Sequence, residues 1–140
     1  MNYKVVYFTR TGRSKRIAGE ISNKLNCENI QITDNFNWKG LLGFIKGGYY
    51  VLKNKNVDIK MNHNLSNYDE LIVVTPLWAG KITPAIRKFL ENVSLSRVHL
   101  VVTSNGSKLI DRKGYKSVSD IVEKDHNEED VINNLINNFL

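Results

Sequence analysis

The 140-residue sequence contains a single cysteine, Cys27, so an intramolecular disulfide is excluded, and we interpret this residue as packing material. The three histidines lack the spacing of metal ligands, and we expect no metal site. No apolar run approaches the roughly 18 residues that a membrane span requires, and the first residues lack the pattern of a signal peptide. We therefore predict a cytoplasmic protein with no membrane span.

The composition is that of an ordinary globular protein, with 41% hydrophobic and 24% charged residues. Its length predicts a single domain over residues 1–140. The net charge of +6 and the pI of about 9.4 favour an anionic partner, such as nucleic acid, acidic lipid, an acidic protein or a phosphorylated cofactor. Because the lysines are dispersed and no basic motif with interleaved aromatic residues is present, we expect no nucleic-acid binding.

The first chemically informative stretch is a strand, a loop and a helix. The residues from Val5 to Phe8 are β-branched or aromatic and uncharged, which predicts a strand covered on both faces. After the loop Thr9–Ser14, apolar residues recur at three- and four-residue steps from Ile17 to Leu25. A helix is therefore expected to begin near Ser14.

The loop between this strand and this helix has the features of an anion site. Backbone N–H groups at a helix N-terminus are unpaired and lie at the positive end of the helix dipole. Gly12 allows a ligand to approach the backbone, and the hydroxyls of Thr9, Thr11 and Ser14 can donate to phosphate oxygens. The same residue types are common helix caps, so the loop alone leaves both interpretations open.

The next two elements are a second strand and an apolar helix. Asn29–Thr33 alternates polar and apolar residues, which predicts a short strand with one wet face at a sheet edge. A helical stripe follows, which we interpret as core packing rather than as a membrane or partner surface. Four glycines weaken this helix by up to about 1 kcal/mol each if they lie in its interior. The stripe consists of Trp38, Leu41, Leu42, Ile45, Tyr49 and Leu52.

Two further strand and helix units follow a polar connection over residues 57–66. Glu70–Thr75 reads as a buried strand, the loop Pro76–Lys81 comes next, and Thr83 and Pro84 have the residue types of a helix N-cap and first position. His99–Thr103 predicts another strand, which runs into Ser104–Ser107. Residues 108–116 show no helical stripe, so we expect a loop there, a strand near 118–122 and a final helix from near Asn127.

Strands that alternate with helices predict a parallel sheet with right-handed crossovers. In such a sheet the carboxyl ends of strands lie at one edge, where ligands bind. The strand ends at Phe8, Thr75 and Thr103 are therefore expected to lie side by side. We predict that Trp78, which follows one of these strands, stacks on a flat ligand, and the alternative is that it covers the end of the sheet.

Three separated motifs resemble those of the flavodoxin-like FMN-binding proteins, and the resemblance covers nearly the whole chain. The loop Thr9–Ser14 is similar to that family's phosphate loop, residues 75–81 with the following helix to its first flavin-facing loop, and Thr103–Gly106 to its second. The resemblance implies a doubly wound, five-stranded parallel sheet of order 2-1-3-4-5 in a three-layer α/β sandwich, with FMN at the switch between strands 1 and 3. Arg13 stands where the family usually has Asn, and Tyr115 is the candidate to complete a flavin sandwich.

The resemblance implies a set of cofactor-binding residues in the three loops. They are Thr9, Arg10, Thr11, Gly12, Arg13 and Ser14 in the first loop, Thr75, Pro76, Leu77, Trp78, Ala79 and Gly80 in the second, and Thr103, Ser104, Asn105 and Gly106 in the third.

Other classes with phosphate loops do not fit these residues. The Walker spacing of glycine and lysine is missing, the carboxylates of phosphotransfer receivers are replaced by Thr9 and Thr75, and the loop has no nucleophilic cysteine of a tyrosine phosphatase. We therefore predict no catalytic side chain and leave the chemistry to the cofactor. The predicted function is an FMN-dependent oxidoreductase acting on a small redox substrate. The alternatives are an electron-transfer flavodoxin that docks on a redox partner protein, and a flavin-free binding module.

Overall fold

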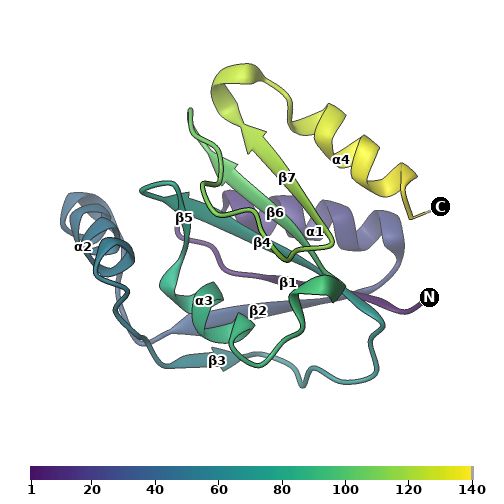
Figure 1. Cartoon of the computed structure of the whole chain (residues 1–140), viewed down its shortest axis with the longest axis horizontal. Coiled ribbons are helices and arrows are strands. Elements are labelled where there is room, and N and C mark those ends of the chain that lie inside the picture. The colour runs from purple at the N-terminus through teal and green to yellow at the C-terminus, as the bar shows by residue number, and fades with distance from the viewer. Residues whose placement is uncertain (140) are drawn as a thin grey trace.

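The computed structural model describes residues 1–139 and contains one seven-stranded sheet (Figure 1). The strand order is β3-β2-β1-β4-β6-β7, and β5 pairs with β4 outside this path. The strands are β1 (Tyr3–Tyr7), β2 (Glu28–Asp34), β3 (Ile59–Met61), β4 (Glu70–Trp78), β5 (Lys81–Ile82), β6 (Val98–Ser104) and β7 (Ser117–Val122).

The prediction of a five-stranded, all-parallel sheet is wrong, because two short antiparallel strands are added. The strands β2, β1, β4, β6 and β7 are parallel and follow the predicted order 2-1-3-4-5. β3 pairs antiparallel with β2, with Ile32 opposite Met61, so β2 is not the sheet edge. Residues 57–66, which we expected to be only a connection, supply this edge strand.

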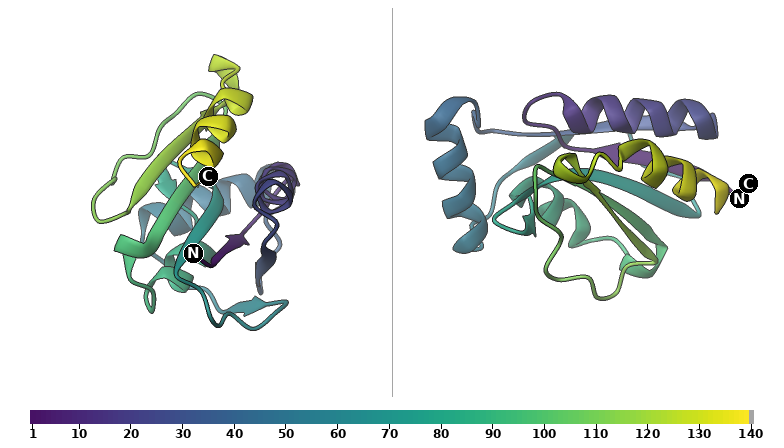
Figure 2. Two further views of the ribbon diagram at one scale, coloured as in Figure 1. Left: turned by 90° about the vertical axis from the view of Figure 1, so that its right-hand side faces the viewer. Right: turned by 90° about the horizontal axis from the view of Figure 1, so that it is seen from above.

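Helices cover both faces of the sheet (Figure 2). The helices are α1 (Arg13–Leu25), α2 (Gly40–Leu52), α3 (Pro84–Leu90) and α4 (Glu128–Asn137), with short 3-10 turns η1 (Leu95–Arg97) and η2 (Glu123–Asp125). α1 and α4 pack on one face and α3 packs on the other. Val5 belongs to the core between the sheet and α1 and α4, and Val6 belongs to the core on the α3 face. Both residues are fully buried, which confirms the prediction that the first strand is covered on both faces.

The end of the chain follows the sequence-based expectation. Residues 108–116 form no helix, β7 lies at the predicted position, and α4 begins after the N-cap Asn127. The Asn127 side chain accepts from the backbone N–H of Val122 at 2.8 Å and donates to the carbonyl of Asp120 at 3.0 Å. This residue therefore holds the chain where the last strand turns into the last helix.

The prediction that the apolar stripe of α2 packs in the core is wrong. Gly43, Gly47 and Val51 form its buried side, and Tyr50 is partly buried against Phe36 and Trp38. The stripe residues of the helix are exposed, namely Leu41, Leu42, Ile45, Tyr49 and Leu52. A Cβ atom on Gly43 would lie 2.1 Å from the backbone carbon and oxygen of Trp38, so only glycine permits this contact. Trp38 is the exception within the stripe, because it precedes the helix and is buried at 4% exposure.

α2 stands beyond the carboxyl ends of the strands rather than over a face of the sheet (Figures 1 and 2). Two indole rings fill the space between them: the Trp38 and Trp78 ring centroids lie 5.0 Å apart, and Phe8 packs edge-on to Trp78 at 5.8 Å. The Trp38 backbone lies against Gly43 and the Trp78 ring lies against Gly47, so these two positions of the helix have no room for a larger side chain.

The segment that we predicted as a loop after Thr75 is a β-hairpin. β4 continues to Trp78, turns at Ala79 and Gly80 with φ of 53° and 75°, and returns as β5. Positive φ at both turn residues is typical of tight hairpin turns, and glycine adopts it without strain. The hairpin extends β4 toward α2, where the Trp78 ring contacts Gly47.

A network of charged side chains lies at the other end of the strands, where β4, β6 and β7 begin. Glu70 is buried and its carboxylate lies 2.8 Å from Nε2 of His99 and 2.6 Å from Nζ of Lys116. Burial alone would raise the pKa of Glu70, but hydrogen bonds from Lys116 and His99 outweigh it and hold that pKa below its ordinary value. The network ties the starts of β4, β6 and β7 together and leaves the carboxyl edge as the open end.

Candidate functional site at the carboxyl edge of the sheet

The first loop turns sharply between β1 and α1. Gly12 has φ of 98°, a left-handed conformation that favours glycine, and its N–H donates to the Thr9 hydroxyl at 2.9 Å. A Cβ atom on Gly12 would meet no atom within 4 Å, so the turn is open to solvent. Thr11 is exposed, whereas Ser14 is buried with its hydroxyl 3.4 Å from that of Thr103.

The start of α1 has the properties of an anion site. The N-cap Gly12 makes no side-chain cap hydrogen bond among the described residues, so the N–H groups of the first turn remain available at the positive end of the helix dipole. The Thr9 hydroxyl accepts from Gly12 and can still donate its own proton, and the exposed Thr11 hydroxyl is a second side-chain donor at the turn.

Two arginines join this loop to its neighbours. Arg10 donates from Nε to the Trp38 carbonyl at 2.7 Å and from Nη2 to the Gly40 carbonyl at 3.0 Å, which anchors the start of α2. Arg13 donates from Nη1 to the Ser104 carbonyl at 2.8 Å and so joins the first and third loops. These acceptors carry no net charge, so both positive charges remain at this edge.

The second loop divides into a buried part and an exposed part. Thr75 is fully buried, and its hydroxyl lies 3.0 Å from that of Thr83, so this side chain stabilises the hairpin and the start of α3. Trp78 is half-buried, with one side against Trp38 and Gly47. On that side Trp78 covers the end of the sheet, which was the predicted alternative to stacking on a flat ligand.

The third loop is a compact turn. The Ser104 hydroxyl accepts from the Ser107 N–H at 3.1 Å and donates to the Ser107 carbonyl. Asn105 and Gly106 are exposed at its tip, and the Asn105 carbonyl accepts from the N–H of Lys124 at 2.9 Å. Thr103 is buried below the turn.

A cavity of about 390 Å³ lies where the three loops meet α2. Of the described residues that line this cavity, Arg10 is positively charged and none is acidic. Its walls are mostly apolar, as is usual for small-molecule sites. The lining residues are Arg10, Phe44, Gly48, Leu77, Trp78, Ala79, Ser104, Asn105, Gly106 and Ser107.

The cavity brings together seven of the predicted site residues from all three loops. The predicted residues that do not line it are Thr9, Thr11, Gly12, Arg13, Ser14, Thr75, Pro76, Gly80 and Thr103. Sequence reasoning missed Phe44 and Gly48, and it included Ser107 in the third loop without naming it as a binding residue. A signal for Phe44 and Gly48 was present, because Phe44 is a large apolar residue outside the predicted stripe and Gly48 lies one turn later on the same side of the helix.

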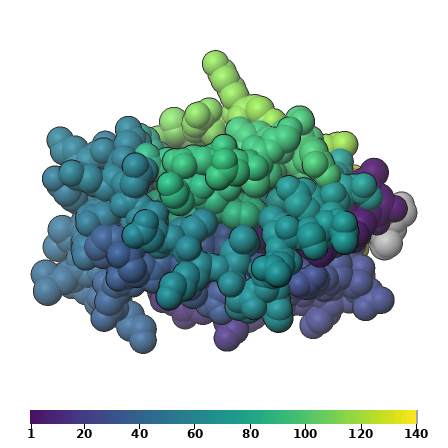
Figure 3. Space-filling view, turned by 90° about the horizontal axis from the view of Figure 1, so that it is seen from below, coloured from purple at the N-terminus to yellow at the C-terminus, as the bar shows by residue number. Residues whose placement is uncertain are grey.

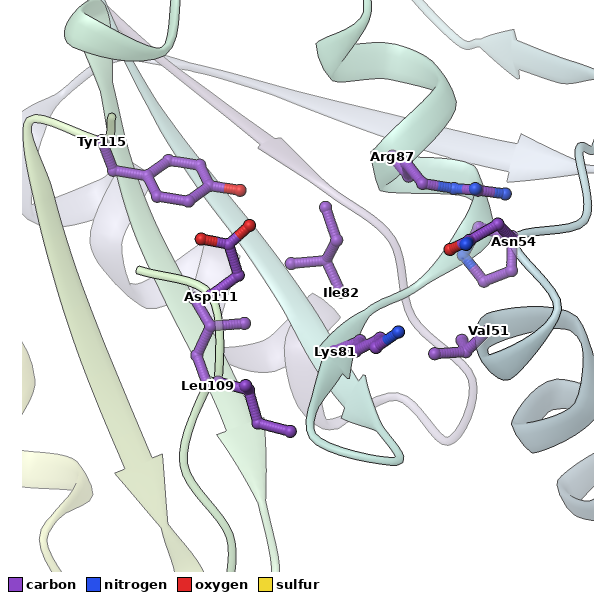
Figure 4. Close-up of a pocket in the computed structure, with 10 residues that line it drawn as sticks. Val51, Asn54, Lys81, Ile82, Arg87, Leu109, Asp111 and Tyr115 are labelled. Carbon is purple, nitrogen blue, oxygen red and sulfur yellow. The ribbon is translucent and has the colours of Figure 1, made fainter. Parts of the chain in front are cut away.

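A second cavity, of about 360 Å³, lies on the other side of the hairpin (Figure 4). The end of α2 contributes Val51 to it, the hairpin contributes Lys81, and α3 contributes Arg87. Tyr115 points into this cavity and does not line the first one, and burial together with the nearby Asp111 carboxylate raises its pKa. The remaining lining residues are Asn54, Ile82, Pro84, Leu109 and Ile110.

Neither cavity offers a metal site. Within residues 1–139, no group of three or more His, Cys, Asp and Glu side chains lies close enough to hold a metal ion.

No helix of that part of the chain has both the length and the hydropathy to cross a bilayer.

No family model and no curated protein match this chain. Solved structures do match its fold. The chain is similar to a flavoprotein from Lactobacillus acidophilus NCFM in complex with FMN, with a TM-score of 0.66, 18% identity, and 92% of this chain and 97% of that one covered. The apo form of that flavoprotein matches with a TM-score of 0.54, 15% identity and coverage of 91% and 96%. A protein from Bacteroides uniformis ATCC 8492, proposed to be a flavoprotein, matches with a TM-score of 0.72, 15% identity and coverage of 93% and 97%.

These similarities show that the chain has a flavodoxin-like fold, as the sequence motifs predicted.

Proposed function

We propose that this chain binds FMN at the carboxyl edge of its sheet and acts as an FMN-dependent oxidoreductase on a small redox substrate. The observation that carries the proposal is the cavity of about 390 Å³, because loops from three strands converge on it beside the open start of α1. A solved structure of the same fold contains FMN, which supports the choice of cofactor.

The residues present suit the two chemically different parts of FMN. The exposed Thr11 hydroxyl, the first-turn N–H groups of α1 and the charge of Arg13 suit a phosphate. Leu77, Trp78 and Phe44 supply apolar and aromatic surface for a flat ring. When bound, FMN supplies hydride and electron transfer, and the residues of this chain hold it, orient it and exclude water.

The second cavity favours an enzyme over an electron carrier. It lies on the other side of the hairpin from the first cavity and has apolar walls. Two of its lining residues, Lys81 and Arg87, are positively charged, and one, Asp111, is negatively charged (Figure 4). A small, flat, anionic substrate suits such a site. The electron-carrier alternative requires no second cavity, so substrate turnover without a partner protein distinguishes the two functions.

The test is a titration of the purified chain with FMN and with riboflavin, which lacks the phosphate, followed by absorbance and calorimetry. We expect FMN to bind at least about 10-fold more tightly than riboflavin, because charge-assisted hydrogen bonds to phosphate contribute about 1.5–3 kcal/mol each. Thr11→Val should weaken FMN binding and leave riboflavin binding unchanged. Thr33→Val, which removes an exposed hydroxyl on β2, is the matched control. Equal affinity for both ligands contradicts a phosphate site in the first loop.

A second variant tests the place of the ring. Trp78→Ala should weaken FMN binding and brighten the emission of the bound flavin, because a stacked indole quenches it and stabilises the complex by about 0.5–1.5 kcal/mol beyond burial. Trp78→Phe keeps an aromatic surface and should retain more of the affinity. Unchanged FMN affinity in Trp78→Ala places the ring elsewhere.

Steady-state reduction of a small quinone by the FMN-loaded protein, with a pyridine nucleotide as the electron donor, then tests the activity. Turnover without a partner protein supports the oxidoreductase. Absence of turnover with tightly bound FMN supports the electron carrier, and absence of FMN binding supports a flavin-free module.

A further inference from the structure

The outer face of α2 is the largest concentration of exposed apolar residues in the described chain. It consists of Leu41, Leu42, Phe44, Ile45, Tyr49 and Leu52, which are 51–82% exposed. Six of the nine large hydrophobic residues that are exposed within residues 1–139 lie in this one helix. A contiguous apolar surface of this kind marks an interaction site rather than a chance exposure.

The position of α2 makes this face accessible to a flat surface. The helix forms one end of the molecule, beyond the carboxyl ends of the strands, and lies across the strand direction (Figures 1 and 2). In the space-filling view the atoms of α2 make up that end (Figure 3). A planar partner can therefore contact the outer face along the whole helix without meeting the body of the protein.

Positive charge frames the outer face. Lys39 lies at the N-cap, Lys53 at the C-cap, and Lys55 follows, all three exposed. Lys46 lies on the flank of the helix, with Nζ 4.1 Å from the Phe36 ring centroid. The sequence contains no Asp or Glu between Asp34 and Asp58, so no carboxylate of this segment offsets the four lysines.

This charge pattern disfavours a second copy of the chain as the partner. In a two-fold symmetric contact the same surface meets itself. A parallel pairing of two α2 helices brings each lysine near its own copy, and an antiparallel pairing brings Lys39 near Lys53. Both arrangements place cations against cations, and two molecules of charge +6 also repel each other at long range.

An anionic lipid surface satisfies both the apolar and the charged features. An amphipathic helix with apolar residues on one side and flanking lysines lies in the plane of the interface, and basic residues are attracted to acidic headgroups. α2 has 13 residues, which is too short to cross a bilayer but long enough for this interfacial mode.

We propose that α2 docks the protein on an anionic membrane surface, with its outer face in the headgroup region and Lys39, Lys53 and Lys55 on acidic headgroups. Phe44 belongs to the outer face and also lines the cavity of about 390 Å³, so docking places the mouth of that cavity at the lipid interface. The docking surface does not depend on FMN.

The test is flotation of the purified chain with vesicles of phosphatidylcholine alone and of phosphatidylcholine mixed with phosphatidylglycerol. We expect binding to the mixed vesicles at least about 10-fold stronger than to phosphatidylcholine alone, and a loss of binding as salt rises, because counterions screen the lysines. Equal binding to both vesicle types, or binding to neither, overturns the proposal.

Two pairs of matched variants locate the surface. Leu42→Ser with Ile45→Ser should weaken vesicle binding about 10-fold or more, whereas Met61→Ser with Ile110→Ser, which changes exposed apolar residues outside α2, should not. Lys53→Gln with Lys55→Gln should weaken it about 10-fold or more, whereas Lys113→Gln with Lys124→Gln makes the same change in net charge and should have little effect. Equal effects of the variants and their controls overturn the role of α2.

Two further measurements keep folding and self-association apart from docking. All these positions are exposed, so thermal unfolding of the variants should match that of the parent. Light scattering should show a monomer, and a dimer that Leu42→Ser with Ile45→Ser dissociates would assign the outer face to a second copy instead. FMN titration of the same variants should remain normal, so a failure of docking is distinguishable from a failure of cofactor binding.

Discussion

Helices α1 and α2 both have 13 residues and follow parallel strands, but they present opposite kinds of surface to the protein. α1 is the more polar helix, and it buries Ile17, Ala18 and Ile21 against the sheet. α2 is the more apolar helix, and it buries two glycines and Val51 while six of its large side chains remain exposed.

The difference teaches that an apolar stripe predicts burial only where the opposing surface has room for it. The sheet face below α1 offers Val5, Ile72 and Val74, between which isoleucine side chains fit. Opposite α2, the Trp38 backbone and the Trp78 ring leave room only for glycine at positions 43 and 47, and the larger Tyr50 and Val51 face the protein farther along the helix. Side-chain volume on the opposite surface therefore selects the inner face of each helix.

The largest expected effect concerns the buried stripe of α1. Ile21 is fully buried and Ile45 of α2 is 59% exposed. Ile21→Ala should lower the free energy of unfolding by about 2–5 kcal/mol, because it removes buried contacts and leaves a cavity. Ile45→Ala should change it by less than about 0.5 kcal/mol. Urea unfolding of both variants measures the difference, and comparable losses would mean that α2 also buries its stripe.

The next effect concerns the glycine side of α2. The added Cβ atom of Gly43→Ala would collide with the Trp38 backbone, so we expect it to loosen α2 by about 1–3 kcal/mol. Gly48 has no atom within 4 Å of such a Cβ position, so Gly48→Ala should stabilise the helix by about 0.4–1 kcal/mol. Hydrogen exchange of the α2 amides reads out both changes. Equal exchange rates in the two variants would show that glycine does not set the approach of this helix.

A smaller effect is expected at the start of α1, if FMN binds there as proposed. Reduction of the flavin adds negative charge, which the nearby cation Arg13 favours, so Arg13→Asn should lower the reduction potential by about 10–30 mV, equivalent to about 0.5–1.4 kcal/mol for two electrons. Lys60→Asn removes an exposed charge on β3 and is the control. Potentiometric titration of the FMN-loaded proteins decides it, and an unchanged or higher potential in Arg13→Asn excludes this residue as a tuning element.

The smallest effect concerns the ion pair that joins α1 to α4. Arg16 donates two hydrogen bonds of 2.7 Å to Glu128, and these bonds hold the pKa of Glu128 below its ordinary value. Because the folded pKa is the lower one, the pair stabilises the fold above the unfolded pKa of about 4.3 and loses this contribution as pH falls through the folded value. Both side chains are partly exposed and screened by solvent, so Glu128→Gln should cost about 0.2–1 kcal/mol at pH 7.

The pH dependence provides the check on this pair. The difference in unfolding free energy between the parent and Glu128→Gln should shrink toward zero near pH 3, and high salt should reduce it at pH 7. A constant difference across this range would mean that Glu128 acts through packing rather than charge.

The sequence by itself determined the flavodoxin-like fold class, the positions of the five parallel strands and the meeting of three loops at one edge. The fold class came from the resemblance of three motifs to the flavodoxin-like proteins. The other two features follow from local rules: uncharged β-branched runs form buried strands, and parallel strands place their carboxyl ends together. Arg10, Trp78 and Asn105 line one cavity for this reason, although they lie far apart in the chain.

Only the tertiary structure decided the two added strands, the hairpin after Thr75 and the orientation of α2. A three-residue edge strand such as β3 has too few residues to show an alternating pattern, and it exists because β2 offers unpaired backbone groups. The outward stripe of α2 has the same period as a buried one, so periodicity cannot identify the side that faces the protein. That choice depends on Trp38 and Trp78, which meet only after the chain has folded and leave too little space for a side chain at Gly43 and Gly47.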